Sequence, residues 1–146
     1  MPVVVIDANI VLDARNANAK RHDAAAGIFG GIDSGDLPRA QLVNYVVPEV
    51  LHPIQKRISK SAASDTLDRL QESRGFEFVH VPKGVHPKAE RLFRLHASSS
   101  GPEWVDSIIA AYMLANDIQY IYSFDDDFDE FDGVTRLNTA TDPFEP

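Results

Sequence analysis

Short runs of β-branched and aromatic residues alternate along the chain with longer segments in which apolar residues recur at helical spacing. Runs typical of buried strands are Val3 to Ile6, Leu42 to Tyr45, Phe76 to Val81, Ile118 to Phe124 and Val134 to Leu137. Helical segments are predicted at Ile10 to Arg15, His22 to Ile32, from about Pro48, Ser61 to Ser73, Pro87 to Ala97 and Trp104 to Ala115. This alternation predicts an α/β fold with a mainly parallel central sheet.

Glycine, proline and serine mark the boundaries of these elements. The pair Gly30-Gly31 and the stretch Ser34 to Asp36 are predicted to end the second helix, and Gly75 the helix that follows Ser61. The polar stretch Ser98 to Pro102 is the best linker, and we interpret it as a connection between elements. At 146 residues the whole chain, 1–146, is predicted to form one domain.

Four acidic residues lie where predicted strands end or predicted helices begin. Asp7 and Asp125 lie just past the carboxyl ends of strands, and Glu49 and Asp106 lie in or near the first turns of helices. Ligands of open parallel sheets gather at the carboxyl ends of the strands. We therefore predict that these four carboxylates converge in space.

The fourth acidic position is ambiguous because acidic residues follow one another from Asp125 to Asp132. Four of them compete for it: Asp125, Asp126, Asp127 and Asp129. The first residue beyond a strand is held by the sheet, whereas later residues enter a loop and point in other directions. Asp125 is therefore our first choice and Asp127 our second.

Each carboxylate taken alone has a structural explanation. Asp7 could cap a helix, and Glu49 and Asp106 could complement helix dipoles. Asp106, however, belongs to the most apolar predicted helix, and Asp7 lies between apolar segments. A buried charge needs a cation or hydrogen-bond partners, and divalent cations relieve the repulsion between converging acids. A metal site therefore explains the pattern better.

Composition excludes several other sites. Without cysteine, only oxygen and imidazole ligands remain, and the five histidines lack metal-binding spacing. Asp125, Asp127 and Asp129 have the spacing of an EF-hand loop. However, Glu130 occupies the position that needs glycine, and Arg136 the position that needs glutamate. No phosphate-binding glycine loop occurs either.

The net charge of −8 is unusual for a protein that binds nucleic acid. Acidic residues that bind metal account for part of it, and a saline cytoplasm is a second explanation. Lys56, Arg57 and Lys60 lie on one predicted helix as a hypothetical contact to a phosphate backbone, although a solvated face is the simpler interpretation. The segment Met1 to Ile6 lacks the features of a signal or membrane segment, so we expect a cytoplasmic protein with no membrane contact.

The ordered motifs resemble those of the PIN-domain ribonucleases, in particular the VapC-type toxins of prokaryotic toxin–antitoxin pairs. The resemblance covers nearly the whole chain and rests on four regions: Val5 to Leu12 with Asp7 and Asn9, Val47 to Leu51 with Glu49, Asp106 to Tyr112, and Tyr122 to Phe128. It implies a PIN-like three-layer α/β/α domain, with a hydroxyl residue and then an acid after a late strand.

The resemblance also implies an activity and its site. Mg²⁺ or Mn²⁺ would be held by Asp7, Glu49, Asp106 and Asp125, with Asp127 as a further ligand, while Asn9 and Ser123 orient the ligands or the attacking water. The substrate would be RNA, and the partners a cognate antitoxin and a second copy of the chain. The alternative is a PIN-like interaction module without catalysis. A phosphatase of the haloacid dehalogenase type is disfavoured, because Asn9 stands where a second Asp is needed.

Overall fold

A computed structural model, which describes residues 2–96 and 100–145, contains a five-stranded parallel sheet. Its strands are β1 (Val3–Ile6), β2 (Arg39–Val43), β3 (Phe76–Val79), β4 (Tyr120–Tyr122) and β5 (Thr135–Leu137). They lie in the order β3-β2-β1-β4-β5, so β1 is central and Val5 pairs with Gln41 on one side and Ile121 on the other. The predicted α/β fold with a parallel sheet is confirmed.

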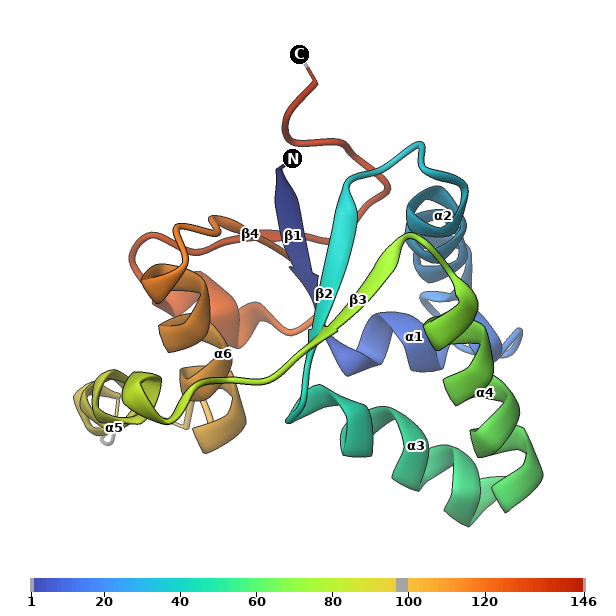
Figure 1. The fold of residues 1–146 in the computed structure, drawn as a ribbon, viewed down its shortest axis with the longest axis horizontal. Helices are drawn as coiled ribbons and strands as arrows, with labels where there is room; N and C mark the ends of the chain where they lie inside the picture. Colours follow the sequence, from blue (N-terminus) through green and yellow to red (C-terminus); the bar gives the residue numbers. More distant parts are fainter. Residues whose placement is uncertain (1, 97–99, 146) are drawn as a thin grey trace.

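Helices cover both faces of the sheet. They are α1 (Ala8–Arg15), α2 (His22–Ser34), α3 (Val46–Arg57), α4 (Lys60–Glu72), α5 (His86–Leu95) and α6 (Trp104–Ala115), with the short 3₁₀ helices η1 (Lys83–Val85) and η2 (Asp126–Glu130). Figure 1 shows α5 and α6 on one side of the sheet and α1 to α4 on the other. The result is a three-layer α/β/α arrangement. A single domain over residues 1–146 stays a prediction.

Several boundaries differ from the sequence-based expectation. The second strand ends at Val43, not at Tyr45, because Tyr45 already has helical backbone angles as the residue that precedes α3. Gly30 and Gly31 lie inside α2, which runs to Ser34 and is capped by Gly35 with a left-handed φ of 88°, within the predicted stretch Ser34 to Asp36. Ala97 and the first two residues of the predicted linker, Ser98 and Ser99, lie outside the described residues.

The central strands are short and fully apolar, and this places polar groups at one end of the sheet. Val4, Val5 and Ile6 are completely buried, and every residue of α6 from Ser107 to Met113 is buried as well. The chain leaves β1 at Asp7, whose N–H donates to the carbonyl of Tyr122 at 3.0 Å. The ends of β1 and β4 are thereby held side by side. No helix among the described residues has the length and apolarity needed to cross a membrane.

Candidate metal centre

Asp7 is the most buried acid at the carboxyl end of the sheet. It is 8% exposed and caps α1, and its carboxylate accepts hydrogen bonds from the Ala8 N–H at 2.8 Å and the Ser123 hydroxyl at 2.7 Å. Burial raises the pKa of Asp7, and the charge of Asp125 raises it further, although these hydrogen bonds oppose the shift. The expected capping role and a position in the acidic site are therefore both present in one residue.

Asn9 and Ser123 connect the two central strands. The fully buried Ser123 hydroxyl accepts from the Asp125 N–H at 3.0 Å while it donates to Asp7. The Asn9 amide donates to Asp7 at 3.2 Å and accepts from the Phe124 N–H at 3.2 Å. Both side chains thus fix the position of Asp7 relative to the segment that carries Asp125, as expected of orienting groups.

Asp106, Asp125 and Asp127 form the tightest acidic group among the described residues. One carboxylate oxygen from each lies within 4.8 Å of the other two, and all three residues are partly buried. Asp125 caps η2 by accepting from the Asp127 N–H at 3.0 Å, so the turn itself brings these two acids together. The acidic stretch predicted as a loop is therefore a 3₁₀ turn that presents Asp127 beside Asp125.

Asp106 is less isolated than its apolar neighbours suggest. It is the third residue of α6, and its carboxylate accepts from the Glu103 N–H at 3.0 Å in a reciprocal capping box. Burial raises the pKa of Asp106 to about 7, against the lowering effect of this hydrogen bond, and the charges of Asp125 and Asp7 also raise it. The hydrogen bond from the Glu103 N–H gives the Asp106 carboxylate one partner, while the negative charges of the acids around it repel this carboxylate.

Glu49 lies in the first turn of α3 and outside the group of three. The residue is exposed, yet desolvation of its carboxyl raises the pKa of Glu49 to about 7, with further contributions from the charges of Asp7 and Glu103. Glu49 therefore faces the same acidic region as Asp7. Glu103 is the acid that the sequence analysis missed, although the spacing Glu-x-x-Asp before an apolar run is the signal of a capping box.

Two arginines lie close to this region. Arg136 on β5 donates to the Ser123 carbonyl at 3.5 Å, but its main partner is Asp129, which it meets through two bonds of 3.0 and 3.1 Å. Arg21 donates to the Phe124 carbonyl at 3.5 Å. These cations contact backbone carbonyls and Asp129, and the carboxylates of the group of three keep their mutual repulsion.

Comparison with known proteins identifies the family. The family model for the PIN domain matches residues 4–134. The chain belongs to the PIN-domain family. A comparison with curated proteins gives no match.

Solved PIN structures share the architecture. Mycobacterium tuberculosis VapC20, described as a sarcin-ricin loop cleaving toxin, has a TM-score of 0.73 at 22% identity over 90% of this chain and 98% of its own. VapBC2 from Rickettsia felis bound to a promoter DNA fragment gives 0.72 at 14% identity, over 94% and 98%. A toxin–antitoxin complex from Klebsiella pneumoniae gives 0.63 at 15%, over 95% and 98%. At these identities the likeness establishes the fold.

The donor set of this PIN domain fits a hard divalent cation. Asp106, Asp125 and Asp127 offer carboxylate oxygens, the ligand type that Mg²⁺ and Mn²⁺ prefer. Desolvation is the larger cause of the raised pKa of both Asp106 and Asp127, and repulsion from neighbouring acids raises both pKa values further. A cation that neutralises these charges would stabilise the folded state.

We expect the metal-free protein to lose stability as the pH rises from about 5 to about 7.5. The folded-state pKa values of Glu49 and Asp106, about 7, lie above those of the unfolded chain. The folded state therefore binds more protons across this window, and deprotonation removes that advantage. At pH 7.5, Mg²⁺ at one hundred times its Kd should restore about 2.7 kcal/mol. That gain corresponds to a rise in Tm of about 8 °C.

Thermal unfolding followed by circular dichroism, with and without Mg²⁺ at both pH values, measures these effects. Asp125→Asn should lose the rise in Tm caused by Mg²⁺, while Asp117→Asn, at the exposed far end of α6, should keep it. An equal Mg²⁺ effect in the wild type and in Asp125→Asn would show that the cation binds elsewhere.

Proposed function

We propose that this PIN protein is a divalent-metal-dependent endoribonuclease and the toxin of a toxin–antitoxin pair. The observation that carries the proposal is the group of three carboxylates, with oxygens within 4.8 Å of one another, at the end of the sheet where Asp7 and Glu49 also lie. The fold shared with a toxin described as cleaving the sarcin-ricin loop supports RNA as the substrate class. Magnesium or manganese is the proposed cofactor.

In the proposed mechanism the chain holds the cation and moves one proton. Asp106, Asp125 and Asp127 would hold the cation, and Asp7 keeps its place beside them through Ser123 and Asn9. A bound divalent cation would supply Lewis acidity to the phosphate and to the attacking water. No cysteine is available as a nucleophile, and the Ser123 hydroxyl is fully buried.

Water is the proposed attacking group. Its oxygen forms a bond to phosphorus as the bond from phosphorus to O3′ breaks, which leaves a 5′-phosphate and a 3′-hydroxyl. Glu49, in the first turn of α3 and within the field of Asp7, is the proposed acceptor of the water proton, and its pKa of about 7 suits that role near neutral pH. O3′ takes a proton from solvent. The Asp7, Asn9 and Ser123 network holds the acids in position while these bonds change.

A panel of purified RNAs incubated with Mg²⁺, with Mn²⁺ and with chelator tests the activity. Cleavage that requires metal, with products carrying 5′-phosphate ends, supports the proposal. If the protein binds RNA or a partner but leaves every RNA of the panel intact under all conditions, the non-catalytic interaction module is favoured.

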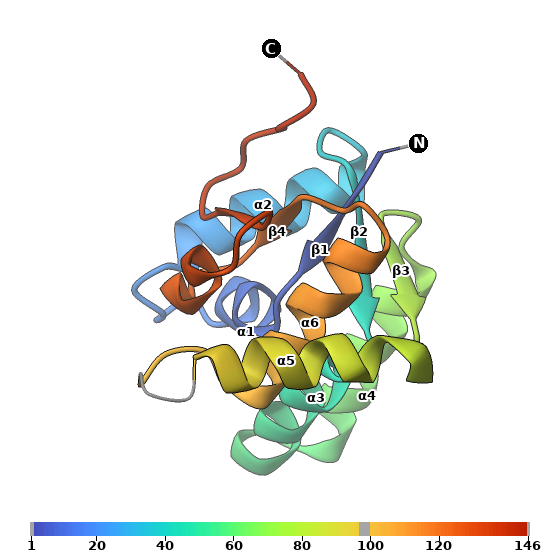
Figure 2. The same ribbon diagram turned by 90° about the vertical axis from the view of Figure 1, so that its left-hand side faces the viewer.

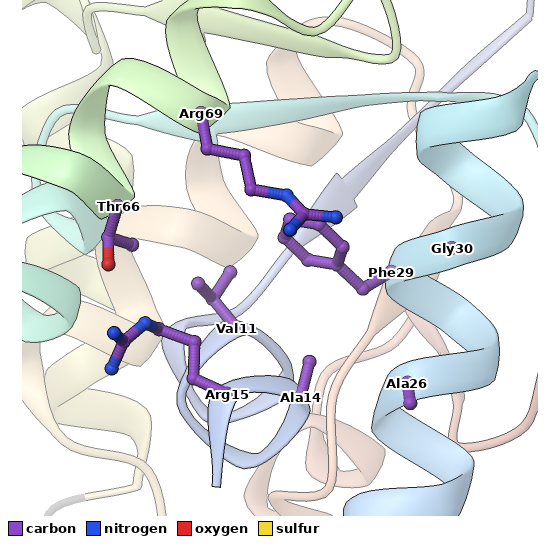
Figure 3. Close-up of a pocket in the computed structure, with 8 residues that line it drawn as sticks. All are labelled: Val11, Ala14, Arg15, Ala26, Phe29, Gly30, Thr66 and Arg69. Carbon is purple, nitrogen blue, oxygen red and sulfur yellow. The ribbon is translucent and has the colours of Figure 1, made fainter.

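The antitoxin is proposed to dock in a cavity of about 370 Å³ between α1, α2 and α4. Val11, Ala14 and Phe29 give it apolar walls, and Figure 3 shows Arg15 and Arg69 reaching into it. The Arg69 guanidinium lies 5.1 Å over the Phe29 ring, and its ion pair with Asp33 is long, at 3.9 Å. Two cations on an acidic protein suit an amphipathic segment that carries acidic residues. Two of the similar structures are complexes of toxin with antitoxin.

Reversing both charges, as Arg15→Glu with Arg69→Glu, is expected to weaken antitoxin binding by about tenfold or more, because like charges across an interface are costly. The measurement is the Kd for the product of the neighbouring antitoxin gene, with Arg74→Glu as the exposed control. Unchanged affinity would place the antitoxin elsewhere. Homodimer formation and cytoplasmic residence stay predictions.

A further inference from the structure

Two aromatic side chains are exposed together where α5 meets α6. Phe93 is 40% exposed and Trp104 is 36% exposed, and their rings form an edge-to-face pair with centroids 5.7 Å apart and planes at 87°. An edge-to-face pair leaves both faces of the edge-on ring uncovered by its partner. Burial of both rings in a core would be the usual outcome, so their shared exposure calls for a ligand with flat apolar surfaces.

The segment that contains η1 and α5 carries the opposite charge to the rest of the protein. Residues 80–96 contain Lys83, Lys88, Arg91 and Arg94 against the single acid Glu90, a formal charge of +3. The whole chain has −8, so the remainder carries −11. Arg91 is exposed, and the Arg94 pair with Glu90, at 3.5 Å with both side chains more than half exposed, is weakened by solvent. The basic segment therefore suits a polyanion.

The elements that carry this surface also lead to the candidate metal centre. Trp104 is the first residue of α6, the helix that carries Asp106, although the two side chains leave the helix on different sides. At the end of α5, the His96 ring packs against Phe131 with centroids 5.3 Å apart, and Phe131 directly follows η2. Figure 2 shows α5 lying across α6. A ligand that extends from this surface along the end of α5 would therefore approach the segment that carries Asp125 and Asp127.

We propose that Phe93, Trp104 and the basic side chains of α5 form a binding surface for single-stranded RNA. Bases stack on the two rings, and phosphates contact Arg91 and Arg94. Aromatic platforms beside positive charge are the means by which proteins hold single strands, because every base offers a flat face and every nucleotide a phosphate. The inference rests on the proposed function, since it names the route of the substrate to that site.

A second copy of the chain is the competing occupant of this apolar surface. A twofold dimer through α5 would bring the same surface of two chains together, and with it two segments of charge +3. Repulsion between the two positive segments opposes that contact. RNA would neutralise the positive charge, and its bases would cover the exposed apolar rings. The charge pattern therefore favours RNA.

Binding can be followed without cleavage, in chelator, because Trp104 is the only tryptophan of the chain. Titration of the full protein with an unlabelled twelve-nucleotide oligouridylate should quench the Trp104 emission as a base stacks on the indole. A labelled copy of the same RNA, followed by fluorescence anisotropy, gives the Kd. Emission that stays constant while anisotropy shows saturated binding would overturn the proposal.

Phe93→Leu removes the ring and keeps the apolar volume. It should weaken RNA binding by about 5- to 150-fold, the range for one lost stack. Phe144→Leu is the matched control, because Phe144 is 41% exposed in a similar edge-to-face pair with Tyr120, at 5.5 Å. Arg91→Gln should lower the slope of log Kd against log salt by about 0.7, the value for one phosphate contact on a single strand.

Sedimentation velocity decides between the two occupants. A Phe93→Leu protein that keeps the wild-type oligomeric state and loses RNA affinity supports the proposal. A change of oligomeric state with unchanged RNA affinity, or equal affinities in Phe93→Leu and Phe144→Leu, overturns it. Cleavage assays separate this proposal from the proposed function. If the wild type and Phe93→Leu both cleave RNA with the same KM, the binding surface is refuted and the proposed function is not.

Discussion

Asp106→Asn is expected to lower the rate of RNA cleavage by about 10²- to 10³-fold, the usual effect of removing one electrostatic group from a preorganised site. Asparagine has nearly the same shape, and its carbonyl oxygen can still accept from the Glu103 N–H at the start of α6. The substitution removes a negative charge from the group that includes Asp125 and Asp127. Metal binding should therefore fail while the helix cap survives.

The stability of the Asp106→Asn protein gives an independent check. Burial and repulsion raise the pKa of Asp106 to about 7, so its charged form destabilises the metal-free fold above that pH. Without Mg²⁺ at pH 7.5, the variant should melt at or above the Tm of the wild type. Asp117→Asn tests the same chemical change at the exposed far end of α6, and should alter neither property.

Asp7→Asn should also abolish cleavage, through a different contact. The Asp7 carboxylate accepts from the Ser123 hydroxyl, which in turn accepts from the Asp125 N–H, so an amide group at position 7 disturbs the placement of Asp125. Full activity in both Asp7→Asn and Asp106→Asn, with native circular dichroism, would refute the site assignment.

The elements that sequence patterns predicted best are those with strong local signals. Trp104 to Ala115 agrees with the structure at both ends, because a strongly apolar run follows the polar stretch Ser98 to Pro102. The strand before α3 was placed too late, because Tyr45 has a high strand propensity but lies in a helical conformation at the start of α3. There, tertiary structure overrides local preference.

For the acidic residues, strand ends predicted that several of them lie close together and not how they are arranged. Asp7, Asn9, Ser123 and Asp125 are connected as expected, because parallel strands end at one edge of the sheet. The place of Asp127 in the group of three, with Glu49 outside it, depends on a 3₁₀ turn and on side-chain directions. No spacing rule encodes those features.

Four of the acids that follow β4 carry the same charge at different positions: Asp125, Asp126, Asp127 and Asp129. Comparing variants of these residues therefore tests which position matters for the site. Asp125 caps η2 and its N–H donates to Ser123, so both its backbone and its side chain are fixed. Asp127 belongs to the same group of three but lies two residues further along, inside η2. Asp126 is exposed and outside that group, and Asp129 is bound to Arg136 at 3.0 Å.

We therefore expect Asp125→Asn to remove most of the cleavage activity, and Asp127→Asn an intermediate part. Asp126→Asn is the matched control and should cost little. Asp129→Asn should also cost little activity, but its broken ion pair with Arg136 should lower the free energy of unfolding by about 1 kcal/mol or less, since Asp129 is half exposed. Cleavage rates at saturating Mg²⁺ rank the variants. If Asp126→Asn were inactive and Asp125→Asn fully active, the turn would present a different carboxylate to the metal, and position beyond the strand would not be what selects the ligand.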